Sequence, residues 1–117
     1  MAKQYLKKLG FKILSTNWRS RRDKRNEIDL VCSDMDCLVF IEVKTRSSNS
    51  LCKGYESINF RKRKALQKTF KDYLKENQNE FMNYRFDVIE IDLNVNGKLD
   101  SEVFHHENIA IFDHCLH

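Results

Sequence analysis

The sequence contains no proline and only three glycines among its 117 residues, and it has no glycine-rich loop of the kind that cradles nucleotide phosphates. No apolar run approaches the ~20 residues that a membrane-spanning helix needs. The N-terminal stretch carries lysines without an apolar core, which argues against a signal peptide. The four cysteines, at positions 32, 37, 52 and 115, form no Cys-x-x-Cys pair, which argues against a zinc ribbon or a thiol redox motif. These absences predict a cytoplasmic protein with reduced thiols, no membrane contact and one domain over residues 1–117.

Charge, by contrast, is plentiful and unevenly distributed. Charged residues make up 32% of the chain, and its formal net charge is +4. Residues 1–84 carry 19 basic and 10 acidic side chains, whereas residues 85–117 carry 2 and 7. A basic body of this kind favours a polyanionic partner such as a nucleic acid. The alternative is a basic surface that is merely solvated.

Two apolar segments, Ile28–Cys32 and Leu38–Thr45, contain ionisable residues. The first includes Asp29, and the second includes Glu42 and Lys44. A charge inside an apolar strand costs free energy unless it is paired or bound to a metal. We therefore look for chemistry in this part of the chain.

The short polar connector Ser33–Asp36 predicts a β-hairpin between these segments. A symmetric loop would place Cys32 opposite Cys37 near the turn and Glu27 opposite Glu42 at the far end. Because alternate residues of a strand point to opposite faces, four ionisable side chains are expected on one face of the hairpin. They are Glu27, Asp29, Glu42 and Lys44.

Crowded carboxylates must share either protons or a cation, and Mg²⁺ or Mn²⁺ with oxygen ligands meets that need. Lys44 would then hold an attacking water or stabilise charge that develops on a phosphate. The alternative is an ordinary salt-bridged sheet surface in which Lys44 neutralises one of the acids.

Three segments carry a family resemblance: N-E-I-D-L-V from Asn26, V-F-I-E-V-K-T-R from Val39 and R-F-D-V-I-E-I from Arg85. Asp29, then twelve residues, then Glu42 with Lys44 two positions later is similar to the D-x(n)-E-x-K core of the PD-(D/E)xK nuclease superfamily. More narrowly, the segments resemble the uncharacterised bacterial YraN-like family, which is related to Holliday junction resolvases. The similarity covers nearly the whole chain.

The resemblance implies a restriction-endonuclease-like α/β fold, a mixed sheet flanked by helices with an α-β-β-β-α-β core. It implies a metal-dependent endonuclease that acts on DNA, including branched or structured DNA. Asp29, Glu42 and Lys44 would be catalytic, and Asp29, Glu42 and Glu27 would bind Mg²⁺ or Mn²⁺. Related resolvases act as dimers, so a homodimer stays an open expectation, although the sequence shows no interface.

The chain also departs from the family pattern. Members usually carry Gly-Glu just before the first helix, whereas this sequence begins at Met1, and Asn26 stands where the family usually has Gly. Two alternatives to an enzyme therefore remain open. One is a nucleic-acid-binding module of the same fold without turnover, and the other is an interaction domain whose basic helix docks an acidic protein.

Periodicity predicts the remaining elements. They are a helix over Ala2–Leu9, a strand over Phe11–Trp18, a long helix over Ser57–Glu76 that connects two parallel strands, a strand over Tyr84–Asp92 and a weak edge strand over Leu99–His105.

Two basic clusters are candidates for contacts with phosphates, one in the loop before the Asp29 strand and one at the start of the long helix. A solvated surface is again the alternative. The histidines near the C-terminus have no recognisable zinc-site spacing and are interpreted as structurally neutral. The candidate nucleic-acid-binding residues are Arg19, Arg21, Arg22, Lys24, Arg25, Arg46, Arg61, Lys62 and Lys64.

Overall fold

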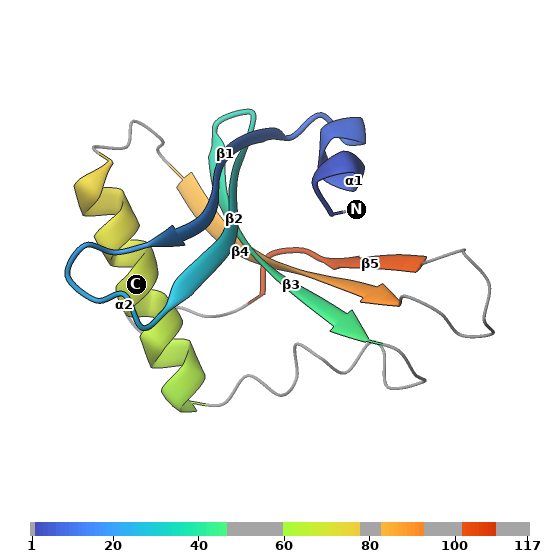
Figure 1. The fold of residues 1–117 in the computed structure, drawn as a ribbon. Helices are drawn as coiled ribbons and strands as arrows, with labels where there is room; N and C mark the ends of the chain where they lie inside the picture. The colour runs from blue at the N-terminus through green and yellow to red at the C-terminus, as the bar shows by residue number, and fades with distance from the viewer. Residues whose placement is uncertain (1, 47–59, 78–82, 93–101, 110–117) are drawn as a thin grey trace.

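The computed structural model describes residues 2–46, 60–77, 83–92 and 102–109, and it follows the predicted order of elements (Figure 1). The predicted beginnings of the long helix at Ser57 and of the last strand at Leu99 lie outside the described residues. The elements are helix α1 (Ala2–Lys8), strands β1 (Lys12–Arg19), β2 (Glu27–Asp34) and β3 (Cys37–Arg46), helix α2 (Phe60–Glu76), and strands β4 (Asn83–Asp92) and β5 (Glu102–His106).

The strands form one five-stranded sheet in the order β1-β2-β3-β4-β5. Strands β3 and β4 are parallel and the other neighbours are antiparallel, which confirms α2 as the crossover between two parallel strands. Helix α2 packs on one face of the sheet, and α1 packs on the other. This mixed sheet with a helix on each face confirms the predicted restriction-endonuclease-like fold class. Neither helix of the described ranges is long and apolar enough to cross a membrane.

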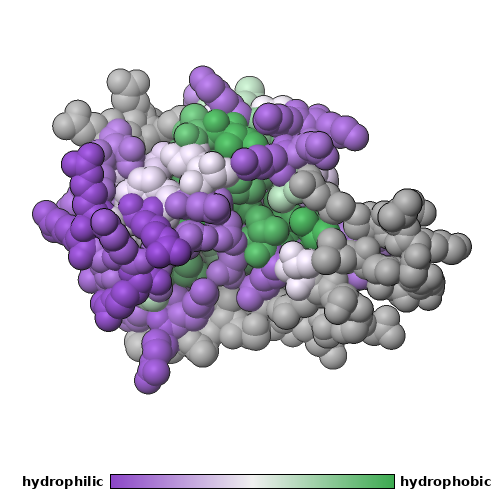
Figure 2. Space-filling view, in the orientation of Figure 1, coloured by the Kyte–Doolittle hydropathy of each residue, from purple (hydrophilic) through white to green (hydrophobic). Residues whose placement is uncertain are grey.

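The core on the α2 side contains several aromatic side chains, contributed by α2 and by the strands that it covers. Phe40 of β3 stacks on Phe70 of α2 with ring centroids 4.2 Å apart, and Trp18 meets Tyr73 edge-on at 5.0 Å. Trp18 is therefore an aromatic residue at the rim of the core. The outer side of α2 and the β1–β2 loop present a hydrophilic surface (Figure 2).

The core on the α1 side is aliphatic. Leu6 of α1 and Ile41 and Ile89 of the central strands are fully buried there, together with Cys32. Burial and the nearby Asp87 carboxylate raise the pKa of the Cys32 thiol to about 12, so it stays protonated at neutral pH. Cys32 and Cys37 are not joined to each other and are both free.

The predicted hairpin register is wrong by two residues. Asp34 pairs with Cys37, so the turn consists of Met35 and Asp36 alone, with Met35 in the left-handed conformation at φ 56°. Two-residue turns with positive φ follow the natural twist of a hairpin better than the symmetric four-residue loop does.

The corrected register changes which residues lie opposite each other. Cys32 pairs with Val39 and not with Cys37, and the last backbone pair toward the open end is Leu30 with Ile41. The next position in this register sets Asp29 opposite Glu42, whereas the symmetric loop had set Glu27 there. The error preserved the faces of the side chains, because side chains alternate with a period of two.

We expect that replacing Phe70 by alanine lowers the free energy of unfolding by about 3–5 kcal/mol, because it leaves a cavity against Phe40. Urea denaturation measures the change. The control is Lys71→Ala, the next residue of the same helix and exposed to solvent, which should change stability by less than about 0.5 kcal/mol. Equal effects of the two substitutions would contradict the assigned helix face.

Candidate functional site

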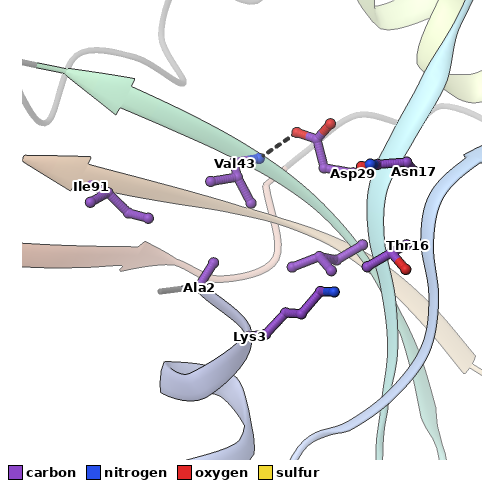
Figure 3. Close-up of a pocket in the computed structure, with 8 residues that line it drawn as sticks. Ala2, Lys3, Thr16, Asn17, Asp29, Val43 and Ile91 are labelled. Atoms are coloured by element: carbon purple, nitrogen blue, oxygen red, sulfur yellow. Dashed lines mark hydrogen bonds between the residues drawn. The ribbon is translucent and has the colours of Figure 1, made fainter. Parts of the chain in front are cut away.

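Strands β2 and β3 separate at Asp29. Their backbone pairing ends at Leu30 and Ile41, and beyond this point the backbone N–H of Val43 donates to Asp29 Oδ2 at 2.8 Å (Figure 3). A side-chain carboxylate thus takes the place of a strand partner. Figure 1 shows the two strands running in different directions beyond this point, and we call this point of strand separation, beside Asp29 and Glu42, the notch.

The alternation of side chains in β2 is interrupted at Asp29, because the residues before and after it point to opposite faces of the sheet. Ile28 packs in the α2-side core, whereas Leu30 packs in the α1-side core. The Asp29 carboxylate itself points across the notch toward β3 (Figure 3). The predicted single face is therefore only partly formed, because Asp29 lies between the strands and Glu42 pairs with a lysine of α2.

Glu42 lies between two lysines. Its Oε1 lies 3.2 Å from Lys62 Nζ of α2, and its Oε2 lies 3.6 Å from Lys44 Nζ. The Glu42 side chain is only 16% exposed, and its Oε2 is buried without a hydrogen-bond partner. A buried carboxylate oxygen without a donor is costly and leaves an acceptor available for a ligand.

The pKa of Asp29 is raised above its ordinary value. Burial is the main cause, and the negative charges of Glu42 and Glu27 add to it, while the Val43 hydrogen bond and Lys62 act in the opposite direction. Asp29 and Glu42 therefore repel each other across the notch. A divalent cation would relieve that repulsion.

The residues fit a hard cation incompletely. Asp29 and Glu42 offer the oxygen donors that Mg²⁺ and Mn²⁺ prefer, and Glu42 Oε2 lacks a donor. The third predicted ligand, Glu27, is bonded to Arg19, whose Nε and terminal nitrogen lie 3.1 and 3.0 Å from Glu27 Oε2. Within the described ranges, no three His, Cys, Asp or Glu side chains are grouped closely enough to hold a metal ion. The metal site thus stays a prediction that depends on Asp29 and Glu42.

The basic loop between β1 and β2 is partly neutralised by its own acids. Arg25 makes a two-pronged contact with Asp23 at 2.9 Å for each bond, and Lys68 of α2 reaches the same carboxylate at 3.3 Å. The hydrogen bonds from Arg25, followed by that from Lys68, hold the pKa of Asp23 well below its usual range. The side chains of the loop that remain exposed are those of Arg21, Arg22 and Lys24, with Arg19 and Arg25 exposed but paired.

The loop is also fixed to the end of α2. Glu76 accepts hydrogen bonds from the buried Ser20 hydroxyl at 2.9 Å and from the Arg21 backbone N–H at 3.3 Å. At the other end of α2, Arg61, Lys62 and Lys64 have exposed side chains. The side chain of Arg46, the last residue of β3, lies outside the described residues.

Sequence reasoning missed two buried acids and their histidine partners. Asp87 is fully buried and accepts hydrogen bonds from Arg85 at 3.0 and 3.1 Å and from His105 Nε2 at 2.8 Å. Glu90 is also fully buried, and His106 Nε2 lies 2.8 Å from its Oε1. Two acids in an otherwise apolar strand were the available signal, and from the sequence Asp87 is expected to pair with Arg85 or Arg46 and not with a histidine.

These pairs are structural. Burial acts to raise the pKa of Asp87, but the hydrogen bonds from His105 and Arg85 outweigh it, so the pKa lies below its ordinary value. The other ring nitrogen of His105 lies 3.1 Å from the Tyr5 hydroxyl, which joins β5 to α1. The carboxylates of β4 thereby hold the edge strand and the first helix on the sheet.

Comparison with known proteins agrees with the resemblance seen in the sequence. The model of a family described as "Uncharacterised protein family UPF0102" matches residues 1–91. A UPF0102 protein of Carboxydothermus hydrogenoformans is 38% identical over 114 residues, which cover 96% of this chain and 90% of that protein.

Two further relatives are similar over most of the chain. A UPF0102 protein of Alkaliphilus oremlandii is 39% identical over 95 residues, covering 80% of this chain and 79% of that protein. A UPF0102 protein of Clostridium botulinum is 43% identical over 96 residues, which cover 80% of this chain and 75% of that protein. The chain therefore belongs to the uncharacterised protein family UPF0102, the YraN-like family that its motifs resemble.

Proposed function

We propose that this protein is a metal-dependent endonuclease that acts on DNA, including branched DNA. The observation that carries the proposal is the notch between β2 and β3. There two partly buried carboxylates, Asp29 and Glu42, stand beside two lysines, and Glu42 Oε2 has no hydrogen-bond donor. Such a pairing of acids with amines serves phosphodiester hydrolysis better than it serves stability.

Asp29 and Glu42 would hold Mg²⁺ or Mn²⁺, which when bound supplies Lewis-acid stabilisation of the phosphate and activation of water. Lys44, two residues beyond Glu42 on the same strand, would orient the attacking water. Lys62, placed by α2 on the other oxygen of Glu42, would hold that carboxylate and neutralise phosphate charge. The exposed basic residues of the β1–β2 loop and of the start of α2 would bind the DNA backbone.

A binding module without turnover is the second candidate. The pairing of Glu27 with Arg19 favours it, because this pairing leaves two carboxylates for a cation within the described ranges. DNA cleavage separates the two candidates, since both predict salt-dependent binding and only the first predicts new DNA ends.

We expect Glu42→Gln and Lys44→Met each to reduce Mg²⁺-dependent cleavage by about 100-fold or more, since each removes a group that acts on the reacting phosphate. The assay compares a four-way junction, a duplex and a single strand of shared sequence, with Mg²⁺, Mn²⁺ or chelator. Matched controls are Glu102→Gln on β5 and Lys75→Met at the end of α2, both exposed and away from the notch. Cleavage by Glu42→Gln at the parent rate would exclude this site.

We expect Asp29→Asn to stabilise the protein at neutral pH while abolishing cleavage. Because the pKa of Asp29 is raised in the folded state, its stabilising contribution is complete below the unfolded pKa of about 3.9 and is lost as pH rises through the folded value. The ionised carboxylate therefore costs stability at neutral pH, and the amide removes that cost.

Thermal unfolding measures this effect across pH. The difference between Asp29→Asn and the parent should shrink as pH falls, and Glu102→Gln should show no such trend. Added Mg²⁺ should raise the Tm of the parent at neutral pH but not that of Asp29→Asn. A variant less stable than the parent at neutral pH would contradict the assigned repulsion.

We expect the double substitution Arg61→Ala and Lys64→Ala to weaken DNA binding uniformly across sequences. If both side chains contact phosphates, the slope of log K against log salt should fall by roughly 2. Fluorescence anisotropy at several salt concentrations measures it. The control is Lys71→Ala with Lys75→Ala in the second half of α2, and an equal loss there would argue for a diffuse basic surface.

A further inference from the structure

A second feature adjoins the notch on the opposite side of the sheet from α2. An open pocket of about 670 Å³ lies beside Asp29, between α1, β1 and the separating strands (Figure 3). Its floor is aliphatic, with Leu30, Val43 and Ile91 from three neighbouring strands. Figure 2 shows hydrophobic surface near the centre of the view, between the hydrophilic surfaces over α1 and α2.

The rim of the pocket is polar. Lys3 extends from α1 toward β1 and β2, and Thr16 and Asn17 line the pocket from β1 (Figure 3). Asn17 has a left-handed backbone with φ 49°, an interruption of the strand, and its side chain lies beside Asp29 (Figure 3). The rim thus offers an ammonium group, a hydroxyl group and a carboxamide next to the proposed reaction site.

This combination matches the chemistry of one nucleotide. Aliphatic side chains can cover the flat face of a base, and a carboxamide presents a donor and an acceptor in one plane, as the edge of a base does. An ammonium group suits a phosphate. The volume lies within the range of roughly 300–1,000 Å³ that is usual for small-ligand sites.

We propose that this pocket receives one unpaired nucleotide of the substrate, next to the phosphodiester that lies between Asp29 and Glu42. The proposal rests on the proposed function and narrows its substrate class. A base inside a duplex is stacked and paired, so it reaches such a pocket only at the cost of unpairing. The preferred substrates are therefore DNAs that already carry an unpaired nucleotide at the cut, such as flaps, bulges and open junctions.

The first test compares three DNA duplexes that differ at a single position. One is fully paired, one carries an unpaired base and one carries an abasic site, which is equally unpaired but has nothing to fill the pocket. Affinities are measured by anisotropy with chelator present, so that cleavage plays no part. We expect the unpaired base to bind roughly tenfold more tightly than the other two, as a base that gains a packing surface should.

The variants follow from the rim. Asn17→Gly removes the carboxamide at a position where glycine tolerates the positive φ without strain, and Lys3→Met removes the charge while keeping the length of the side chain. Asn17→Gly should reduce the preference for the unpaired base, whereas Lys3→Met should weaken binding of the unpaired-base and abasic duplexes alike. The matched control is Lys12→Met, an exposed lysine of β1 that does not line the pocket, which should keep the preference.

The second test is independent of DNA binding and of catalysis. Deoxyadenosine monophosphate is added to protein with labelled methyl groups, and the signals of Leu30, Val43 and Ile91 should shift, with smaller shifts in Asn17→Gly. If the methyl signals shift and the unpaired base is preferred but no DNA is cleaved, the nuclease proposal is wrong and the pocket assignment holds. Cleavage with equal affinity for the three duplexes, or unmoved methyl signals, would overturn the pocket assignment and leave the nuclease in place.

Discussion

The hydrogen bond from the Val43 backbone to the Asp29 carboxylate determines the shape of this molecule beside the acids and lysines of the candidate site. A backbone N–H in a partly buried strand needs an acceptor, and here a side chain supplies it in place of the neighbouring strand. Strands β2 and β3 can therefore separate without leaving that donor unpaired. The notch, the approach of α2 to Glu42 and the pocket on the α1 side all adjoin this point.

The sheet contains both fully buried and partly buried acids, and their surroundings distinguish them. Asp87 accepts hydrogen bonds from Arg85, His105 and the Asn108 backbone, and its pKa is lowered. Asp29 has one backbone donor and a raised pKa. A fully bonded carboxylate stabilises a fold, whereas crowded and incompletely bonded carboxylates are typical of a site that awaits a ligand. On this ground the proposed function is assigned to the notch, and the histidine pairs are assigned to the framework.

The positive charge of the chain is likewise divided into two uses. Some basic side chains pair with acids of the chain. Arg25 and Lys68, for example, both contact Asp23, and these contacts tie the β1–β2 loop to α2. Other basic side chains are exposed at the start of α2 and along the loop, and these two elements border the notch. A polyanion drawn to these surfaces would meet the carboxylates at the point where the proposed cation would offset their charge.

The sequence by itself determined the order of the elements and the parallel crossover, and it singled out the acids of the candidate site, because periodicity and charge in apolar strands are local properties. It did not determine the hairpin register, since a shift of two residues preserves every face and only the geometry of the Met35 turn decides between the alternatives. Nor did it reveal that Asp29 would bridge to Val43, that His105 and His106 would bond two buried carboxylates, or that α1 would border a pocket. These features join residues far apart in the chain, and only tertiary packing brings them within bonding distance.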